Sequence, residues 1–230
     1  MTRDADELSG VLAALEPVLT EAASQGSARL PPERALAERL GVPRRRLRLA
    51  LDHLQRRGVI FRRHGQGTFI APPPHPDRGR NRLLAGRTSP EQVMDVRLQI
   101  EPHLAQLAAR FATAEDLEQL ERLMRKTVEA RSARDYDLAD EVFHFRIAEL
   151  AGNPLFQEIY DLIRDLRRDT GWRERREKTH SPQVISVLAE QHRRIFDAIA
   201  SRDEAAAGAE LRQHLDYVAR RIRRPPASEG

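Results

Sequence analysis

Apolar residues in the first part of the chain recur every three or four positions, which is the spacing that places them on one face of an α-helix. The first such stretch contains Leu8, Val11, Leu12, Leu15, Val18 and Leu19. A second, shorter stretch begins after Pro31-Pro32 and stops at Gly41, and a third runs from Leu47 to Gly58. Two β-rich runs, 59–62 and 68–70, then flank a glycine-containing loop. The pattern predicts helix, helix, tight turn, helix and β-hairpin.

A proline-rich segment separates this part from the rest of the chain. Residues 71–76 contain four prolines, and the polar stretch 77–89 follows them. Because proline stiffens the backbone and cannot continue a helix, we expect a linker here. From Pro90 onward, six apolar stripes at helical spacing are joined by short connections, which is typical of an antiparallel helical bundle. The predicted fold is mainly α, with a first domain at 1–72, a linker at 73–89, an all-helical domain at 90–222 and a flexible tail at 223–230.

Basic residues are concentrated in one region. Residues 29–64 hold eleven arginines against three acidic residues, whereas residues 81–230 hold 25 basic and 26 acidic residues. A basic segment on a near-neutral body suits a polyanion-binding protein, although a GC-rich genome also favours arginine. The chain has no cysteine, which excludes disulfides, thiolate catalysis and cysteine-ligated metal sites. No apolar run has the length of a membrane span and no signal-peptide pattern opens the chain, so we expect a cytoplasmic protein.

The order of elements in the first domain is that of a winged helix-turn-helix. In such a domain the third helix enters the major groove of DNA, where each base pair shows a distinct pattern of donors and acceptors. Burial of the apolar face leaves Arg44, Arg45 and Arg48 directed outward, and arginine suits contacts to phosphate and guanine. Alternatively, single arginines of this cluster solvate the helix face or pair with the nearby carboxylates of Glu33, Glu38 and Asp52.

Residues Leu30–Val42 (LPPERALAERLGV), then Arg44 and Arg48, then Gly65–Phe69 (GQGTF), together resemble the GntR family of bacterial transcription regulators. The resemblance implies that Arg44 reads guanine, while Arg34 and Arg48 contact phosphates or neighbouring bases. With Arg45 added for its outward position, the predicted DNA-binding residues are Arg34, Arg44, Arg45, Arg48, His64 and Gly65. Leu49 stands where the family commonly has an acidic residue, and Arg45-Arg46 where it has a Thr-Pro-like pair, so the operator sequence stays open.

Three histidines of the helical domain lie on apolar helix faces. Asp140 and His144 are four residues apart and therefore share one face of a helix. His192 shares a face with Leu188 and Ile195, and His214 shares one with Leu211 and Val218. A buried imidazole needs hydrogen-bond partners or a cation. Three histidines and one aspartate suit Zn²⁺, Ni²⁺ or a similar divalent metal ion, and alternatively each histidine is an ordinary hydrogen-bonded core residue.

Several motifs of this domain together look like the FCD ligand-binding domain of the FadR subfamily. They are Arg97–Glu101, Asp140–His144, Gly152–Pro154, Glu190–Ile195 and Arg212–Leu215. Members with this aspartate and three histidines hold a divalent metal ion, which implies Asp140, His144, His192 and His214 as ligands here. The resemblance also implies a small organic acid as effector, with Arg97 as the clamp for its carboxylate and Arg146 and Asn153 as further candidates. Alternatively, Arg97 pairs with Glu101, four residues away.

These features predict a metabolite-responsive transcription regulator. Two copies would form a homodimer and present two recognition helices to a pseudo-palindromic operator in double-stranded DNA. A small carboxylate bound in the metal-containing bundle would favour one placement of the DNA-binding domains, and most relatives are repressors released by ligand. One alternative is a metal-dependent hydrolase fused to a DNA-binding module, because three histidines and a carboxylate can activate water. No residue resembles a dedicated general base, so we expect no enzyme activity. A second alternative is a non-specific nucleoid-type DNA-binding protein.

Overall fold

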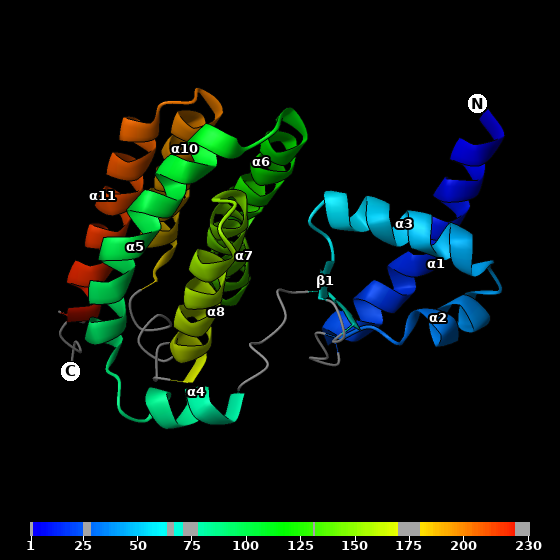
Figure 1. Cartoon of the computed structure of the whole chain (residues 1–230), viewed down its shortest axis with the longest axis horizontal. Helices are drawn as coiled ribbons and strands as arrows, with labels where there is room; N and C mark the ends of the chain where they lie inside the picture. The colour runs from blue at the N-terminus through cyan, green and yellow to red at the C-terminus, as the bar shows by residue number, and fades with distance from the viewer. Residues whose placement is uncertain are drawn as a thin grey trace. The chain divides into compact units, whose positions relative to one another are not determined.

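The computed structural model of the chain describes residues 2–24, 29–63, 67–70, 78–130, 132–169 and 180–223. The chain forms two compact units, Met1–Pro73 and Pro74–Gly230, and both are drawn in Figure 1. Both units are mainly helical, and the strands among the described residues form a two-stranded antiparallel sheet in the first unit. The predicted mainly α fold, a winged helix-turn-helix followed by a helical bundle, is confirmed.

The first unit consists of three helices and a hairpin. They are α1 (Thr2–Ser24), α2 (Glu33–Leu40), α3 (Arg44–Arg56), β1 (Phe61–Arg63) and β2 (Gly67–Phe69). The strands pair with Phe61 opposite Phe69 and Arg63 opposite Gly67. Both α1 and α2 pack against α3. The shared core includes Leu15, Leu36, Leu47, Leu51 and Ile60, each at most 1% exposed.

A tight turn between α2 and α3 fixes where the third helix begins. Gly41 ends α2 in the left-handed region with φ of +63°, a conformation that favours glycine. The Val42 amide then donates a hydrogen bond to the Ala37 carbonyl at 3.1 Å, which satisfies one of the last carbonyls of α2. Pro43 precedes α3, and its carbonyl accepts the amide of Leu47 at 3.0 Å. The turn therefore sets which side chains of α3 face the core and which face solvent.

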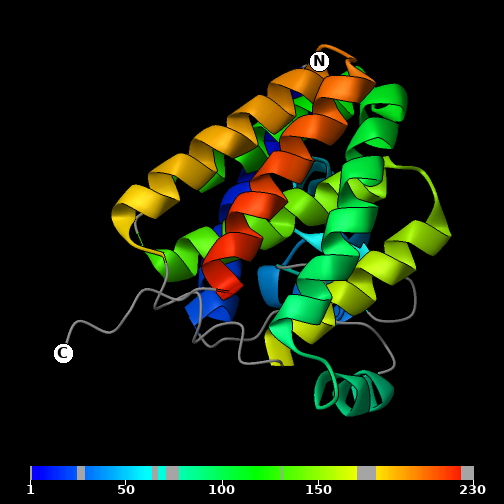
Figure 2. The same ribbon diagram turned by 90° about the vertical axis from the view of Figure 1, so that its left-hand side faces the viewer.

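The second unit is helical throughout its described residues. Its helices are α4 (Arg78–Ala85), α5 (Pro90–Phe111), α6 (Ala114–Glu129), α7 (Ala133–Leu150), α8 (Pro154–Asp169), α10 (Pro182–Ala200) and α11 (Glu204–Arg223). Helices α5, α11 and α10 lie side by side (Figure 2), and α7 contacts α5, α6, α8 and α10. None of the described helices has the length and apolar character needed to cross a membrane.

Local sequence signals set where several of these helices start. The Ser89 hydroxyl accepts the Gln92 amide at 3.3 Å, and the Gln92 side chain accepts the Ser89 amide at 2.9 Å. This reciprocal capping box, with Pro90 in the first helical position, begins α5. Helix α8 begins after Asn153, as its Asn-Pro pair predicts, and the Asn153 side chain accepts the Leu155 amide at 3.0 Å.

Helix α4 lies inside the segment that the sequence assigns to the linker. It packs against α8, and the Asn81 amide donates a hydrogen bond to the Asp165 carboxylate at 3.1 Å, with both residues buried. On its other side Leu83 is 77% exposed. The sequence of this segment is polar and has no complete apolar stripe, so it does not predict a helix. The contact with α8 is a feature that the local sequence does not show.

Candidate metal centre and nucleic-acid interface

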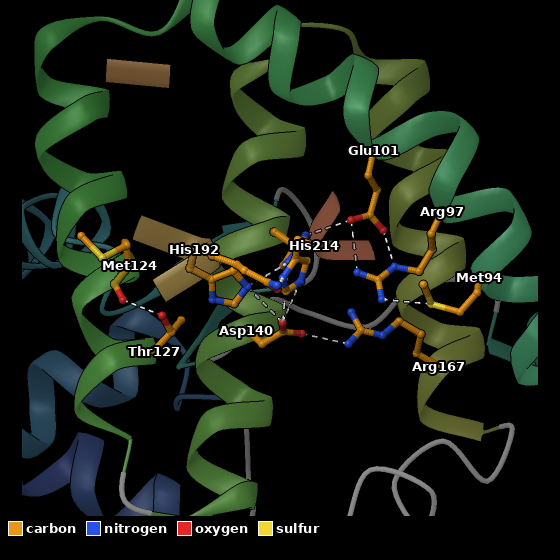
Figure 3. A network of polar contacts seen from close by, with 11 residues as sticks. Met94, Arg97, Glu101, Met124, Thr127, Asp140, Arg167, His192 and His214 are labelled. Carbon is orange, nitrogen blue, oxygen red and sulfur yellow. Dashed lines mark hydrogen bonds and ion pairs between the residues drawn. The ribbon is translucent and has the colours of Figure 1, made fainter. Parts of the chain in front are cut away.

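The structure brings the four predicted metal ligands together in the second unit. Asp140 and His144 lie one turn apart on α7, His192 lies on α10 and His214 on α11, and each is at most 2% exposed. One ligand atom of each lies within 4.8 Å of the other three. Asp140 Oδ1 is 3.4, 3.6 and 4.0 Å from the Nε2 atoms of His192, His144 and His214, respectively. Figure 3 shows the side chains of Asp140, His192 and His214 pointing toward one another.

Contacts on the far side of two rings orient them toward this cluster. His144 Nδ1 lies 2.8 Å from a carboxylate oxygen of Glu101 on α5, and His214 Nδ1 lies 3.0 Å from the side-chain oxygen of Gln191 on α10. When Nδ1 of each ring donates to these acceptors, Nε2 presents a lone pair to the cluster. This is the arrangement of metal-binding histidines, whose outer nitrogen is held by a carboxylate or a carbonyl.

The surroundings of His214 favour its neutral imidazole, and Asp140 is paired with an arginine. Burial lowers the pKa of His214, and the neighbouring His192 and His144 lower it further. Asp140 accepts a hydrogen bond from Arg167 of α8 at 3.0 Å through Oδ2, which leaves Oδ1 toward the histidines. Neutral imidazole and carboxylate are the forms that bind metal ions. The four residues can therefore hold a divalent cation.

Arg97 and Glu101 form a buried ion pair beside the cluster. Arg97 is 1% exposed, and its Nε and Nη2 donate to the two Glu101 oxygens at 2.5 and 3.2 Å. Burial raises the pKa of Glu101, but the Arg97 charge and the His144 hydrogen bond outweigh burial and bring it to about 2. The pairing of Arg97 with Glu101, which the sequence left as an alternative, is present. Figure 3 shows Glu101 beside Arg97, and because Glu101 also contacts His144 it connects Arg97 to the cluster.

A tyrosine of α8 adds a polar group to the same interior. Tyr160 is fully buried, and within the described residues its hydroxyl has no hydrogen-bond partner. Burial raises the pKa of Tyr160, and the charge of Glu101 raises it further, so the phenol remains a proton donor. A buried hydroxyl without an acceptor is costly, and a bound carboxylate would satisfy it.

Arg146 and Asn153, the other two candidate effector residues, make their contacts elsewhere. Arg146 lies two positions after His144, so its side chain leaves the other side of α7. Its guanidinium contacts Asp116 at 2.5 Å and Glu149 at 3.1 Å. Asn153 is exposed and caps α8. Neither contact involves a member of the metal cluster.

In the first unit, the start of α3 carries two exposed cations. Arg44 and Arg45 are exposed, and within the described part of the chain neither forms an ion pair. Helix N-termini also favour anions. These two arginines are therefore positioned to contact a nucleic acid without first breaking an intramolecular pair.

The other predicted DNA-binding arginines are paired. Arg48 lies 3.5 Å from Glu33, and Arg34 lies 3.3 Å from Glu38 in a pair that is exposed to solvent. Glu33 also binds Arg62 of β1, which links the hairpin to the start of α2. Exposed pairs of this kind are weak and exchange readily for phosphate. The predicted contacts His64 and Gly65 lie outside the described residues.

The residues that orient the cluster are not among the predicted metal ligands. Glu101 is 43 residues from His144, Arg167 is 27 residues from Asp140, and Gln191 is 23 residues from His214. From the sequence, Glu101 is predicted only as a partner of Arg97. Gln191 carries a weak signal, because it is a polar residue beside His192 on an apolar helix. Nothing local marks Arg167, because its partner lies on another helix.

Together, a helix-turn-helix with a hairpin and a helical bundle with a buried cluster that could hold a metal ion are typical of a DNA-binding transcription regulator. The family of bacterial regulatory proteins called the gntR family matches residues 10–70, and the FCD domain family matches residues 92–217. The chain belongs to the GntR family of bacterial transcription regulators and carries an FCD domain, an architecture that fits the FadR subfamily.

Curated relatives and a solved structure agree with this assignment. The chain is 31% identical to "Putative L-lactate dehydrogenase operon regulatory protein" of Escherichia coli (strain K12), over 94% of this chain and 85% of the relative. It is 29% identical to the HTH-type transcriptional regulator LutR of Bacillus subtilis (strain 168), over 83% and 89%. The structure of E. coli McbR/YncC shares the fold, with 18% identity, a TM-score of 0.52 and 93% and 97% coverage. Both curated relatives are named as regulators, and with the two family matches they support a regulator rather than an enzyme, which argues against the hydrolase alternative.

Proposed function

We propose that this regulator is a metabolite-responsive repressor that binds a specific operator as a homodimer and senses a small carboxylate in its metal-containing bundle. The observation that carries the proposal is the convergence of Asp140, His144, His192 and His214, all buried, on one point. Structural cores bury single histidines often, but three facing imidazoles and a carboxylate on three helices are the donor set of a metal site.

The donor set fits a divalent transition metal such as Zn²⁺ or Ni²⁺. Its three nitrogen donors and single oxygen donor suit these ions better than Mg²⁺ or Ca²⁺, which prefer oxygen. Burial lowers the pKa of His214 and favours its neutral form, and Glu101 and Gln191 hold two of the rings in place. The bound ion would supply a Lewis acid for a ligand's carboxylate. Asp140, His144, His192 and His214 would hold the ion.

The groups beside the cluster support an organic acid as effector. Arg97 contacts Glu101 on one side, and its Nη1 lies 3.7 Å from the Met94 sulfur, a weak acceptor. A carboxylate is a stronger acceptor for this nitrogen, and the Tyr160 hydroxyl is a second donor in the same interior. The E. coli relative is named for an L-lactate dehydrogenase operon, and lactate is a small hydroxy acid. The proposal uses Arg97 and Tyr160 rather than Arg146 and Asn153.

The DNA-binding unit completes the proposal. Arg44 and Arg45 contact the operator through α3, and a homodimer presents two such helices to two half-sites. The effector acts by binding one arrangement of the dimer better than another, and it shifts the equilibrium only by that difference in affinity. As in a repressor, the ligand-bound arrangement has the lower affinity for the operator.

Metal content and ligand stabilisation together test the proposal. Elemental analysis of the purified full chain should find about one divalent metal ion per chain, and His192→Ala should lower it. His103→Ala is the matched control, because His103 is exposed on α5 and contacts Gln106. A screen of small carboxylates should find one that raises Tm. At one hundred times its Kd, this ligand should raise the free energy of unfolding by about 2.7 kcal/mol. Full metal occupancy in His192→Ala would contradict the assigned site.

A further inference from the structure

One leucine on the recognition helix lies on the side facing away from the core. The buried residues of α3 are Leu47, Ala50, Leu51 and Leu54. Leu49 is 53% exposed. It lies one turn after Arg45, on the line that runs opposite the buried face. In the described part of the first unit, no other large apolar side chain is exposed.

Leu49 is not part of the hydrophobic core of its own unit. The core beneath α3 is complete, since Leu47 and Leu51 are fully buried and contact the cluster formed with α1 and α2. A polar residue would serve the exposed position at least as well for solubility. Single exposed leucines are common on protein surfaces, so exposure alone assigns no role to Leu49. Its neighbours do.

The surface around Leu49 is cationic and suits a polyanion. Arg45 precedes it by one turn, Arg48 is adjacent, and Arg44 and Arg45 have no carboxylate partner within the described residues. A second copy of α3 docked on Leu49 would bring these arginines against their own counterparts, which like-charge repulsion disfavours. Double-stranded DNA offers phosphates for the arginines and, between them, the edges of the bases.

We propose that Leu49 reads thymine by contacting its C5-methyl group in the major groove. Leucine has no donor or acceptor, so its one means of discriminating bases is apolar contact, and thymine alone presents a methyl group there. Arg45 and Leu49 are four residues apart, about 6 Å along the helix axis, or less than two base-pair steps. The two side chains therefore reach adjacent positions of one half-site. The inference rests on the proposed sequence-specific binding of DNA.

Removing a single methyl group from the DNA tests this assignment. The full-length protein first selects its preferred site from random duplexes, and each thymine in that site is then replaced by uracil, which lacks only the methyl. We expect one thymine in each half-site to show about fourfold weaker binding as uracil, the effect of burying one methyl group. Leu49→Ala should bind the thymine and uracil duplexes equally, while Leu49→Met, which keeps an apolar side chain, should retain the preference.

Controls separate this effect from a folding defect. Leu49→Ala should keep the Tm and the affinity for unselected DNA of the parent protein, because the side chain is exposed and the phosphate contacts remain. Leu83→Ala removes an exposed leucine from α4 in the second unit and should keep the fourfold preference. The inference is wrong if no thymine is sensitive to uracil, or if Leu49→Ala keeps the preference. A protein that selects no site at all would refute the proposed specific binding as well.

Discussion

Arg44 and Arg45 are exposed at the start of α3 and have no carboxylate partner within the described residues, whereas Arg97, Arg164 and Arg167 of the bundle are at most 5% exposed. Each of the three bundle arginines contacts a carboxylate. The two units therefore use the same residue type in opposite environments. Arg44 and Arg45 are exposed to solvent and available to a polyanion, whereas Arg97, Arg164 and Arg167 are desolvated and paired.

The difference shows what each unit can tolerate. A hydrated arginine can move to follow a phosphate, and its loss removes one external contact. A buried charge has left water at a cost of several kcal/mol and depends on its partner to offset it. The paired charges therefore favour one geometry of the bundle interior, which the proposed site for a metal ion and a small ligand would require.

The largest predicted effect is on the free energy of unfolding when a buried ion pair is broken. Breaking an exposed ion pair gives the comparison. Arg97–Glu101 and Arg110–Glu204 are both bidentate arginine–glutamate pairs, one buried and one at the surface. Glu101→Gln should lower the free energy of unfolding by about 3–5 kcal/mol, because it leaves the Arg97 charge buried without its counter-ion. Glu204→Gln should change it very little.

Urea unfolding of both variants, followed by circular dichroism, measures this comparison. Each substitution replaces a carboxylate with an amide of the same shape, so packing is preserved, and the two results differ through burial and through the added contact of Glu101 with His144. Equal destabilisation by Glu101→Gln and Glu204→Gln would show that the interior pair is no more dependent on its partner than the surface pair, contrary to the comparison.

A second, smaller effect concerns the exposed arginines. Arg44→Ala should weaken binding to the selected operator by about 1–3 kcal/mol and relax the preference at one base position, while leaving the unfolding transition unchanged. Arg125→Ala, which removes an exposed arginine from α6, is the control and should leave operator affinity unchanged. Fluorescence anisotropy at fixed salt measures both variants. An Arg44→Ala protein with the parent's affinity and base preference would remove Arg44 from the interface.

Much of the fold follows from local signals in the sequence. Gly41 predicts the end of α2 because its left-handed conformation favours glycine, and the Asn-Pro pair at 153–154 predicts the start of α8. Helix α4 does not follow in this way. Its stability depends on contacts such as Asn81 with Asp165, 84 residues away, and no local periodicity encodes a partner at that distance.

The candidate site also combines features that the sequence predicts with contacts that it does not predict. Asp140 and His144 are predicted together because one helical turn separates them, and the apolar faces around His192 and His214 point those rings inward. The contacts of Arg167 with Asp140 and of Glu101 with His144 join different helices. They depend on how α5, α7 and α8 pack, which the hydrophobic pattern of each helix leaves undetermined.

The central proposal is that binding of a carboxylate in the bundle changes how tightly the first unit binds DNA. The most direct test measures the operator affinity of the full-length, metal-loaded protein with and without the carboxylate that raises its Tm. We predict a change in Kd of about 5- to 150-fold for the parent protein and none for His192→Ala. An operator affinity that stays the same with and without the stabilising carboxylate, or an undiminished response in His192→Ala, would contradict the claim.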